Sequence, residues 1–115
     1  MDGRYRFGPP TKEPYLERTM TVGTYAANAF GLFDMHGNVL EWCSDEYDSK
    51  YYEKRVEVDP TGPPADKGSL RVLRGGSWSF NPIIARSAYR YRYAPGNRYY
   101  NSGFRVACVV GVKTP

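Results

Sequence analysis

The sequence predicts a small α+β domain that is irregular and rich in loops. Its 115 residues, 41% of them hydrophobic, suffice for one modest core and leave no length for a second. Twelve glycines and nine prolines interrupt the chain so often that only short runs of strand-forming residues remain between turns. We therefore expect a single domain over residues 1–115.

Four short segments have the composition of β-strands. They are Tyr5–Phe7, Met20–Tyr25, Arg71–Arg74 and Phe104–Val110. The last is the clearest, and its apolar run predicts a strand at the centre of the sheet. The prolines among the first twenty residues exclude a regular helix there, and Asn28–Gly31 is expected to turn the chain. Closely spaced Gly and Pro predict a loop over Asp59–Gly68.

The stretch from Trp42 to Glu57 mixes aromatic and acidic side chains. One tryptophan and three tyrosines stand among five Asp and Glu residues. This composition predicts a polar segment that lies over the surface.

Charge is distributed very unevenly along the chain. Residues 1–70 carry eight basic and twelve acidic side chains, whereas residues 71–115 carry eight basic side chains and no acidic one. The asymmetry indicates either an anionic partner for the basic half or a fold in which the two halves face each other. The sequence leaves both alternatives open.

The segment from Arg71 to Arg105 holds seven arginines and five of the eleven tyrosines. Tyr and Arg alternate over Ala88–Tyr93, which would place rings on one face and guanidinium groups on the other if the chain is extended. We expect Arg90, Arg92 and Arg105 to be mainly structural, in salt bridges with the acidic half. The side chains expected to be more exposed are Tyr93, Arg98, Tyr99 and Tyr100.

Oxygen-bearing side chains are concentrated between Gly31 and Trp42. Asp34, Asn38 and Glu41 supply carboxylate and amide oxygens, and Gly37 lets backbone carbonyls join them, which is the mixture that calcium prefers. The alternative is a short capped turn, with Asn38 as N-cap and Glu41 three residues later. His36 is interpreted as a polar turn residue.

Cysteine and histidine are too few for a zinc site. Cys43 and Cys108 are 65 positions apart without a CxxC spacing, and we interpret them as two buried free thiols, with a disulfide between them as the alternative. The chain has no apolar run long enough to span a bilayer and no signal-peptide core near its N-terminus. We expect a soluble chain, and its compartment stays unknown.

Four blocks of sequence resemble a known family. They are NAFGLFDMHGNVLEWCSD (Asn28–Asp45), DPTGP (Asp59–Pro63), RVLRGGSW (Arg71–Trp78) and GFRVA (Gly103–Ala107). In this order they are similar to the signature blocks of the formylglycine-generating (sulfatase-modifying factor) enzymes. The resemblance implies a loop-rich C-type-lectin-like fold with short antiparallel strands. It covers the C-terminal part of the family's domain, so we expect the N-terminal part of that fold to be lacking.

The resemblance also implies metal sites. A structural calcium ion would be bound by the side chains of Asp34 and Glu41 and by the carbonyl groups of Gly37 and Val39. Catalytic members of the family resemble copper oxidases with two cysteine ligands, and Cu(I) selects such sulfur ligands. Those two positions fall on Phe80 and Ala88 here, so we expect no copper and no catalytic residue.

A second branch of the family contains ligand-binding variable proteins diversified by retroelements. The segment 79–102 has the Tyr, Ser, Asn and Gly content that adaptable binding loops use. We therefore expect a non-catalytic binding domain, with a formylglycine-generating-type oxidoreductase or its degenerate remnant as the alternative. The candidate ligand-binding residues are Phe80, Asn81, Tyr89, Tyr91, Tyr93, Arg98, Tyr99 and Tyr100.

The expected partners follow from the same residues. Arg beside Tyr favours a protein or a small acidic or aromatic ligand, through forked hydrogen bonds and stacking. We expect no nucleic-acid ligand, because no recognised nucleic-acid motif is present. A homo-oligomer, or a second chain that completes the core, stays open.

Overall fold

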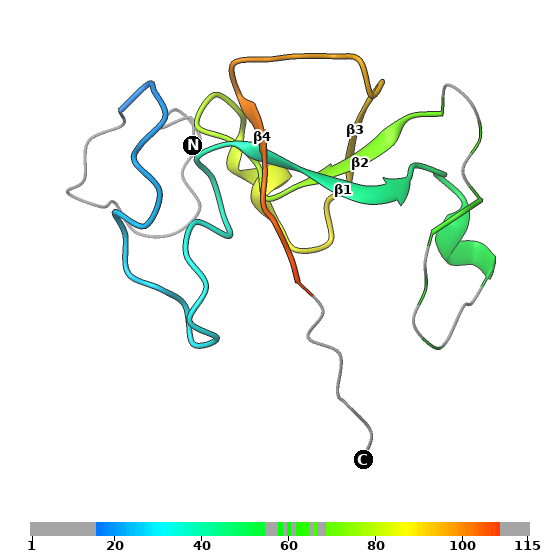
Figure 1. The fold of residues 1–115 in the computed structure, drawn as a ribbon, viewed down its shortest axis with the longest axis horizontal. Coiled ribbons are helices and arrows are strands. Elements are labelled where there is room, and N and C mark those ends of the chain that lie inside the picture. Colours follow the sequence, from blue (N-terminus) through cyan, green and yellow to red (C-terminus); the bar gives the residue numbers. More distant parts are fainter. Residues whose placement is uncertain are drawn as a thin grey trace.

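Four short strands form one mixed sheet in the computed structural model, which describes residues 16–54, 58, 60, 62–64, 66 and 69–108. The strands are β1 (Leu40–Glu46), β2 (Arg71–Arg74), β3 (Tyr91–Tyr93) and β4 (Ser102–Phe104). Their order is β3-β2-β1-β4, as Figure 1 shows. β2 pairs antiparallel with β1 and with β3, which confirms the predicted short antiparallel strands, and β4 runs parallel to β1.

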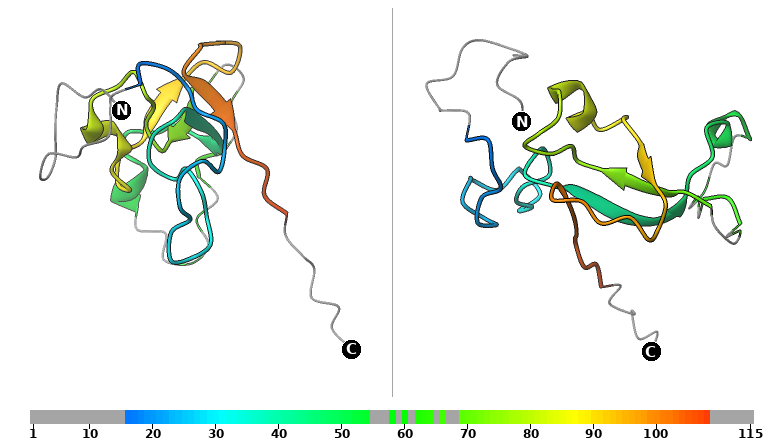
Figure 2. Two further views of the ribbon diagram at one scale, coloured as in Figure 1. Left: turned by 90° about the vertical axis from the view of Figure 1, so that its left-hand side faces the viewer. Right: turned by 90° about the horizontal axis from the view of Figure 1, so that it is seen from above.

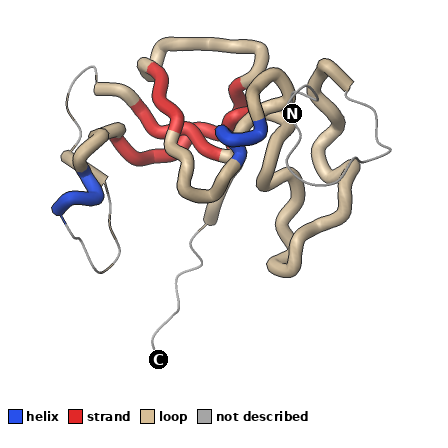
Figure 3. Tube along the Cα trace, turned by 180° about the vertical axis from the view of Figure 1, so that it is seen from behind, coloured by secondary structure: helices blue, strands red, loops and turns tan. Residues whose placement is uncertain are grey.

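Loops dominate the rest of the described chain, as the sequence predicted. Two single-turn 3-10 helices, η1 (Tyr51–Lys54) and η2 (Pro82–Ala85), are the only helices among the described residues. Figure 3 shows long loops on both sides of the small sheet. None of these helices has the length and apolar character needed to cross a membrane.

β1 lies in the middle of the sheet, which corrects the predicted surface segment for residues 42–46, whereas Ser49, Lys50, Tyr52 and Glu53 further along it are exposed. Leu40 is completely buried, and Glu46 at the other end of the strand is only 5% exposed. The acidic residues are accommodated because arginines neutralise them. Arg71 pairs with Glu46 at 2.9 Å, and Arg105 pairs with Glu41 at 2.6 Å.

The core of the described chain is small. Its buried apolar side chains are Leu40, Val72, Leu73 and Ala85. Leu40 and Leu73 come from the adjacent strands β1 and β2, and both are fully buried. Gly76 follows β2 and packs directly against the backbone of Ala85 in η2. The glycine pair after β2 therefore brings η2 onto the end of the sheet.

The predicted strand at Arg71–Arg74 is confirmed as β2, but the one at Met20–Tyr25 is wrong. That segment is a loop with a turn at Gly23, whose φ is +74°. Its backbone N–H groups donate hydrogen bonds to side chains instead of to a partner strand. Gly23 N–H donates to Asp34 Oδ2 at 2.8 Å, and Met20 N–H donates to Asn38 Oδ1 at 3.1 Å. The segment predicted at Tyr5–Phe7 lies outside the described residues.

Asn38 does not cap a helix. Its φ is +60° and β1 begins two residues later, so the capped-turn interpretation is wrong. The turn at Asn28–Gly31 is confirmed by the bond from Gly31 N–H to Asn28 O, 2.9 Å long. The described residues of Asp59–Gly68 contain neither helix nor strand, which agrees with the predicted loop.

The prediction of a central strand over Phe104–Val110 is wrong. β4 ends at Phe104 and lies at the edge of the sheet, and residues 105–108 are not in a strand. Figure 2 shows the chain leaving the sheet after β4. Phe104 and Val106 are 78% and 84% exposed, so the apolar pattern here does not mark the core of the described chain. Residues 109 and 110 lie outside the described part.

Gly31 and Gly76 form a matched pair for testing the close contact with η2. Their φ angles are +74° and +72°, but an added Cβ would meet nothing within 4 Å at Gly31 and would lie 2.9 Å from Ala85 Cα at Gly76. We expect Gly31→Ala to lower the free energy of unfolding by about 1–2 kcal/mol through its left-handed backbone. Gly76→Ala should lose about 1–3 kcal/mol more through overpacking. Urea unfolding followed by circular dichroism measures both; equal losses would refute a role for the Ala85 contact.

Candidate functional site

Five aromatic rings form a continuous surface, here called the tyrosine face. It consists of Phe80, Tyr89, Tyr91, Tyr93 and Tyr99. Tyr91 lies at the centre, with ring centroids 5.3 Å from Phe80, 6.4 Å from Tyr89 and 5.0 Å from Tyr93. Tyr99 extends the row, 4.4 Å from Tyr93. The segment 79–102 thus brings five of its eight predicted ligand-binding residues together.

The arginines that alternate with these tyrosines turn to the other side of β3. The guanidinium carbon of Arg90 lies 4.9 Å from the ring centroid of Tyr47 and 4.5 Å from that of Tyr52. Arg92 lies 4.7 Å from the Tyr47 ring and donates to the Tyr47 hydroxyl at 3.1 Å. The predicted separation of rings and guanidinium groups is therefore confirmed.

The partners of these arginines differ from those expected. Arg90 donates to the carbonyl oxygen of Asp48, and neither Arg90 nor Arg92 forms an ion pair with a described residue. Cation–π contacts take the place of the expected salt bridges, because Tyr47 lies beneath both guanidinium groups. Of these three arginines, Arg105 alone forms an ion pair with a described acidic residue, which is Glu41.

The remaining predicted ligand residues lie around the tyrosine face. Tyr100 is 73% exposed and its ring centroid is 5.6 Å from that of Trp78. Arg98 and Tyr99 are exposed as predicted, whereas Tyr93 is half-buried, since its ring lies against those of Trp42, Tyr91 and Tyr99. Asn81 caps η2 by accepting from Ile83 N–H at 3.0 Å.

Asn101 is a positioning residue that the sequence analysis missed. It is 4% exposed, its side chain donates to Ser79 Oγ at 3.0 Å, and its carbonyl oxygen accepts from Leu40 N–H at 2.8 Å. Ser79 in turn lies 3.3 Å from the buried Ser77 hydroxyl. These contacts fix the loop after β3 to β1 and to the start of the segment 79–102. Nothing in the local sequence distinguished Asn101 from the other polar loop residues.

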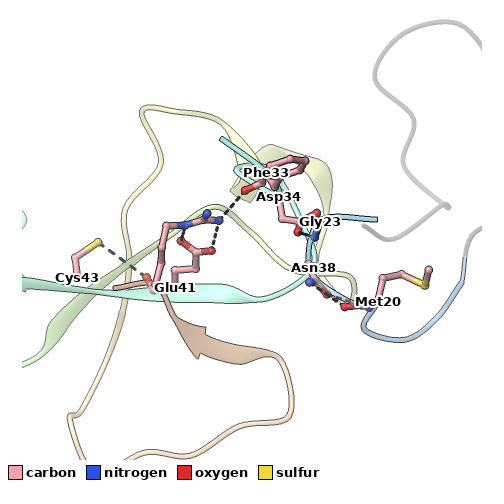
Figure 4. Close-up of polar contacts among 8 residues, drawn as sticks. Met20, Gly23, Phe33, Asp34, Asn38, Glu41 and Cys43 are labelled. Atoms are coloured by element: carbon pink, nitrogen blue, oxygen red, sulfur yellow. Dashed lines mark hydrogen bonds and ion pairs between the residues drawn. The ribbon is translucent and has the colours of Figure 1, made fainter. Parts of the chain in front are cut away.

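Figure 4 shows Asp34 and Glu41, the two carboxylates of the expected calcium site, with their polar contacts. Glu41 accepts two hydrogen bonds from Arg105, at 2.8 Å from Nε and 2.6 Å from Nη2. Arg105 also donates to Phe33 O at 2.8 Å. Asp34 accepts from Gly23 N–H, while Gly37 N–H donates to Gly75 O at 2.8 Å.

The guanidinium group of Arg105 already supplies a cation to this site. Its hydrogen bond with Glu41 is the main cause that raises the pKa of Arg105, and the charges of Glu41 and Asp34 act in the same direction. The described residues contain no group of three or more His, Cys, Asp or Glu side chains that could hold a metal ion. A calcium ion bound by two carboxylates and two backbone carbonyl groups would have to compete with Arg105 for Glu41.

The positions of the family's two copper ligands carry no sulfur. Phe80 is part of the tyrosine face, and Ala88 is exposed beside Tyr89. Cys43 and Cys108 are free thiols, as expected, but Cys43 is half-buried and Cys108 is exposed rather than buried.

A loop-rich mixed sheet that carries these signature blocks defines a C-type-lectin-like fold of the formylglycine-generating type. The family model of the sulfatase-modifying factor enzyme 1-like domain matches residues 3–110. The chain belongs to this family.

Similarity to individual proteins supports the same assignment. The chain is 44% identical over 97 residues to the serine/threonine-protein kinase pkn1 of Chlamydia caviae, covering 83% of this chain and 15% of the kinase. It is 41% identical over 108 residues to the formylglycine-generating enzyme of Streptomyces coelicolor, covering 91% and 33% of the two chains.

Two solved structures share the fold. Treponema denticola variable protein 1 has a TM-score of 0.61 and 34% identity, covering 76% of this chain and 31% of its own. PvdO from Pseudomonas aeruginosa has a TM-score of 0.67 and 38% identity, covering 76% and 33%. The chain thus spans a third or less of the length of each of these four proteins.

The pH dependence of Tyr93 tests the packing of the tyrosine face. Three causes raise the pKa of Tyr93 from 10.0 to about 12. Burial is the largest, a hydrogen bond with Tyr91 is the second, and the charges of the neighbouring tyrosines are the third. The neutral phenol is therefore favoured in the folded state, so its contribution to stability is complete below pH 10 and is lost as the pH rises through 12. We expect the difference between ultraviolet titrations of the wild type and Tyr93→Phe to have its midpoint near pH 12. A midpoint near 10 would mean that this ring is not packed as described.

Proposed function

We propose that this chain is a non-catalytic binding domain that uses the tyrosine face, together with Arg98 and Tyr100, to bind a protein or a small acidic or aromatic ligand. One observation carries the proposal. A continuous row of rings includes Phe80, one of the two positions at which the family resemblance implies copper ligands, and Ala88 at the other position directly precedes Tyr89.

The chemistry of the surface supports binding. Tyrosine offers a large apolar area and a hydroxyl group with only two rotatable bonds, so it makes strong contacts at a low entropic cost. Tyr99 and Tyr100 are 45% and 73% exposed at one end of the row. Arg98 beside them is exposed and adds a forked donor for acidic groups.

The relatives support two versions of this function. Likeness to Treponema denticola variable protein 1 favours a variable protein, and the composition of the segment 79–102 suits diversification by a retroelement. Likeness to the Streptomyces coelicolor enzyme favours a formylglycine-generating-type oxidoreductase, or a degenerate remnant of one. The absence of sulfur at Phe80 and Ala88 supports the first version.

The proposal extends to a calcium-stabilised scaffold. The spacing of Asp34, Gly37, Val39 and Glu41 supports it, although Arg105 holds Glu41. A calcium ion would replace the guanidinium group of Arg105 as the cation beside the Glu41 carboxylate. Calcium binding should then compete with the ion pair between Glu41 and Arg105.

Selection of peptide ligands tests the binding surface. We expect peptides selected from a random displayed library to lose at least tenfold in affinity with Tyr100→Ala, because interface tyrosines contribute about 2 kcal/mol or more at hot spots. Tyr52→Ala is the matched control, since Tyr52 is also well exposed, at 69%, but lies with Arg90 on the other side of β3. Fluorescence polarisation measures both affinities. Equal losses in the two variants, or peptides that bind without Tyr100, would contradict the proposal.

Metal analysis tests the scaffold and the alternative function. We expect about one calcium ion per chain by mass spectrometry, and a melting temperature that falls when a chelator removes it. Glu41→Gln should abolish this dependence, whereas Glu53→Gln, an exposed change of the same charge, should not. No copper should remain after incubation with Cu(I) and gel filtration. Retained copper with formylglycine formation on a sulfatase peptide would favour the oxidoreductase.

A further inference from the structure

The outer edge of β4 is a surface that the tyrosine face does not include. β4 stands last in the strand order β3-β2-β1-β4, so it pairs with β1 on one side and with no described strand on the other. Just before β4, Leu40 N–H donates to Asn101 O at 2.8 Å. Because the backbone groups of successive residues in a strand point to alternate sides, those of Gly103 also point to β1, and those of Phe104 point outward. The edge therefore offers an N–H and a C=O group at Phe104 to a further strand.

The side chains of this edge alternate between the two faces of the sheet. The Cα partner of Phe104 on β1 is Trp42, so these two residues share one face. Arg105 lies on the opposite face, where it donates to the Glu41 carboxylate. Phe104 is 78% exposed, and Val106, the next residue of the same parity, is 84% exposed. The edge thus presents apolar side chains on one face and a guanidinium group on the other.

The charge at this edge does not prevent another strand from pairing with it. Charged side chains commonly protect an edge strand against pairing with a second chain. Here the charge of Arg105 is balanced by Glu41, at 2.6 Å. Phe104 and Val106, on either side of Arg105, carry no charge. The sequence of the edge is therefore suited to strand addition.

The edge is held in place by contacts on both sides of Phe104. A Cβ at Gly103 would lie 2.9 Å from Val39 Cγ2, so glycine lets β4 lie this close to β1. Beyond the strand, Arg105 donates to Phe33 O at 2.8 Å in addition to its bonds with Glu41. These contacts order the edge in advance, which lowers the entropic cost of adding a strand.

Charge indicates which strand fits this edge. Residues 71–115 hold eight basic side chains and no acidic one. Arg105 is 36% exposed and uses Nε and Nη2 in its bonds with described residues, so Nη1 can donate to a further carboxylate. A second copy of this chain would bring another basic segment against Arg105, and like charges on neighbouring strands are unfavourable. An acidic strand is therefore favoured over self-association.

We propose that the outer edge of β4 binds an extended segment of another protein, in which apolar side chains alternate with acidic ones. The backbone of this segment pairs with the N–H and C=O groups of Phe104. Its apolar side chains cover Phe104 and Val106 on one face, and an acidic side chain accepts from Nη1 of Arg105 on the other. This inference rests on the β4 edge alone and goes beyond the function proposed for the tyrosine face.

A synthetic peptide tests the proposal. The probe is a capped peptide of about nine residues in which valine and glutamate alternate, which suits an added strand. It is titrated into the isotope-labelled chain and followed by nuclear magnetic resonance. We expect the amide signal of Phe104 to shift and its hydrogen to exchange more slowly, because this N–H donates to the peptide backbone. A peptide with lysine in place of glutamate should bind about tenfold more weakly, because it brings cations to Arg105.

Two methylated peptides test whether the backbone is recognised. One carries N-methyl groups on its valine amides, and the other carries them on its glutamate amides. In an added strand the amides of one residue type face β4, and those of the other type face solvent. We therefore expect one methylated peptide to lose about tenfold in affinity through its missing hydrogen bonds, and the other to bind like the unmodified probe.

Substitutions in the chain test the apolar contacts. Phe104→Ala should weaken binding of the valine–glutamate peptide about tenfold, because the ring is no longer buried by the peptide. Phe30→Ala is the matched control and should bind as the wild type does, since Phe30 is 87% exposed but lies in the turn at residues 28–31, outside the sheet. Val106→Ala, beyond the end of β4, guards against misfolding of Phe104→Ala and should weaken binding about fivefold. Circular dichroism checks the fold of each variant.

The proposal is overturned if the peptide leaves the Phe104 amide unchanged, if neither methylated peptide loses affinity, or if the lysine peptide binds as tightly as the glutamate peptide. It is equally overturned if analytical ultracentrifugation shows a dimer that Phe104→Ala abolishes, since the edge would then pair with a second copy. Tyr100→Ala should leave peptide binding at β4 intact. Failure of this proposal and failure of the function proposed for the tyrosine face can thus be told apart.

Discussion

The pairing of β1 with β2 is the interaction on which the described structure depends. It buries Leu40 and Leu73 completely, and it provides the two strands on which β4 and β3 are added at the edges. The tyrosine face is attached to the sheet through β3 and therefore through β2. The same pairing is irregular between Trp42 and Glu46. A disturbance of this pair would therefore reach the tyrosine face.

The uneven charge of the chain is partly used inside the fold. The acidic first part supplies Glu41 and Glu46 to β1, and the basic second part supplies Arg71 and Arg105 to neutralise them. The hypothesis that the two halves face each other thus accounts for these ion pairs. It does not account for Arg98, which is exposed at the end of the tyrosine face. The arginines of the basic part therefore include both residues that pair inside the fold, Arg71 and Arg105, and one that is exposed, Arg98.

The sequence predicted those features that follow from local period and composition. Arg71–Arg74 is a strand, and the alternation after Ala88 separates rings from guanidinium groups, because a period of two needs no information from elsewhere. The family resemblance supplied the fold class. The position of β1 could not be predicted in this way, since its acidic residues become compatible with a central strand only when Arg71 and Arg105 arrive from distant parts of the chain. The apolar run Phe104–Val110 led to the wrong prediction of a central strand, because an apolar run does not show whether a partner strand is present on each side.

The Tyr/Arg alternation separates two sets of contacts within one short segment. Arg90 and Arg92 make their contacts with Tyr47, Tyr52 and the Asp48 carbonyl behind β3, whereas Tyr89, Tyr91 and Tyr93 contact one another and other rings in front. A substitution on the ring side therefore leaves the arginine contacts in place. Asn101 fixes the loop after β3 through Ser79 and Leu40, and the Tyr99 hydroxyl accepts a hydrogen bond from Asn97 within that loop. The path of the segment is thus fixed behind β3 and at Asn101, while its ring side supplies the tyrosine face.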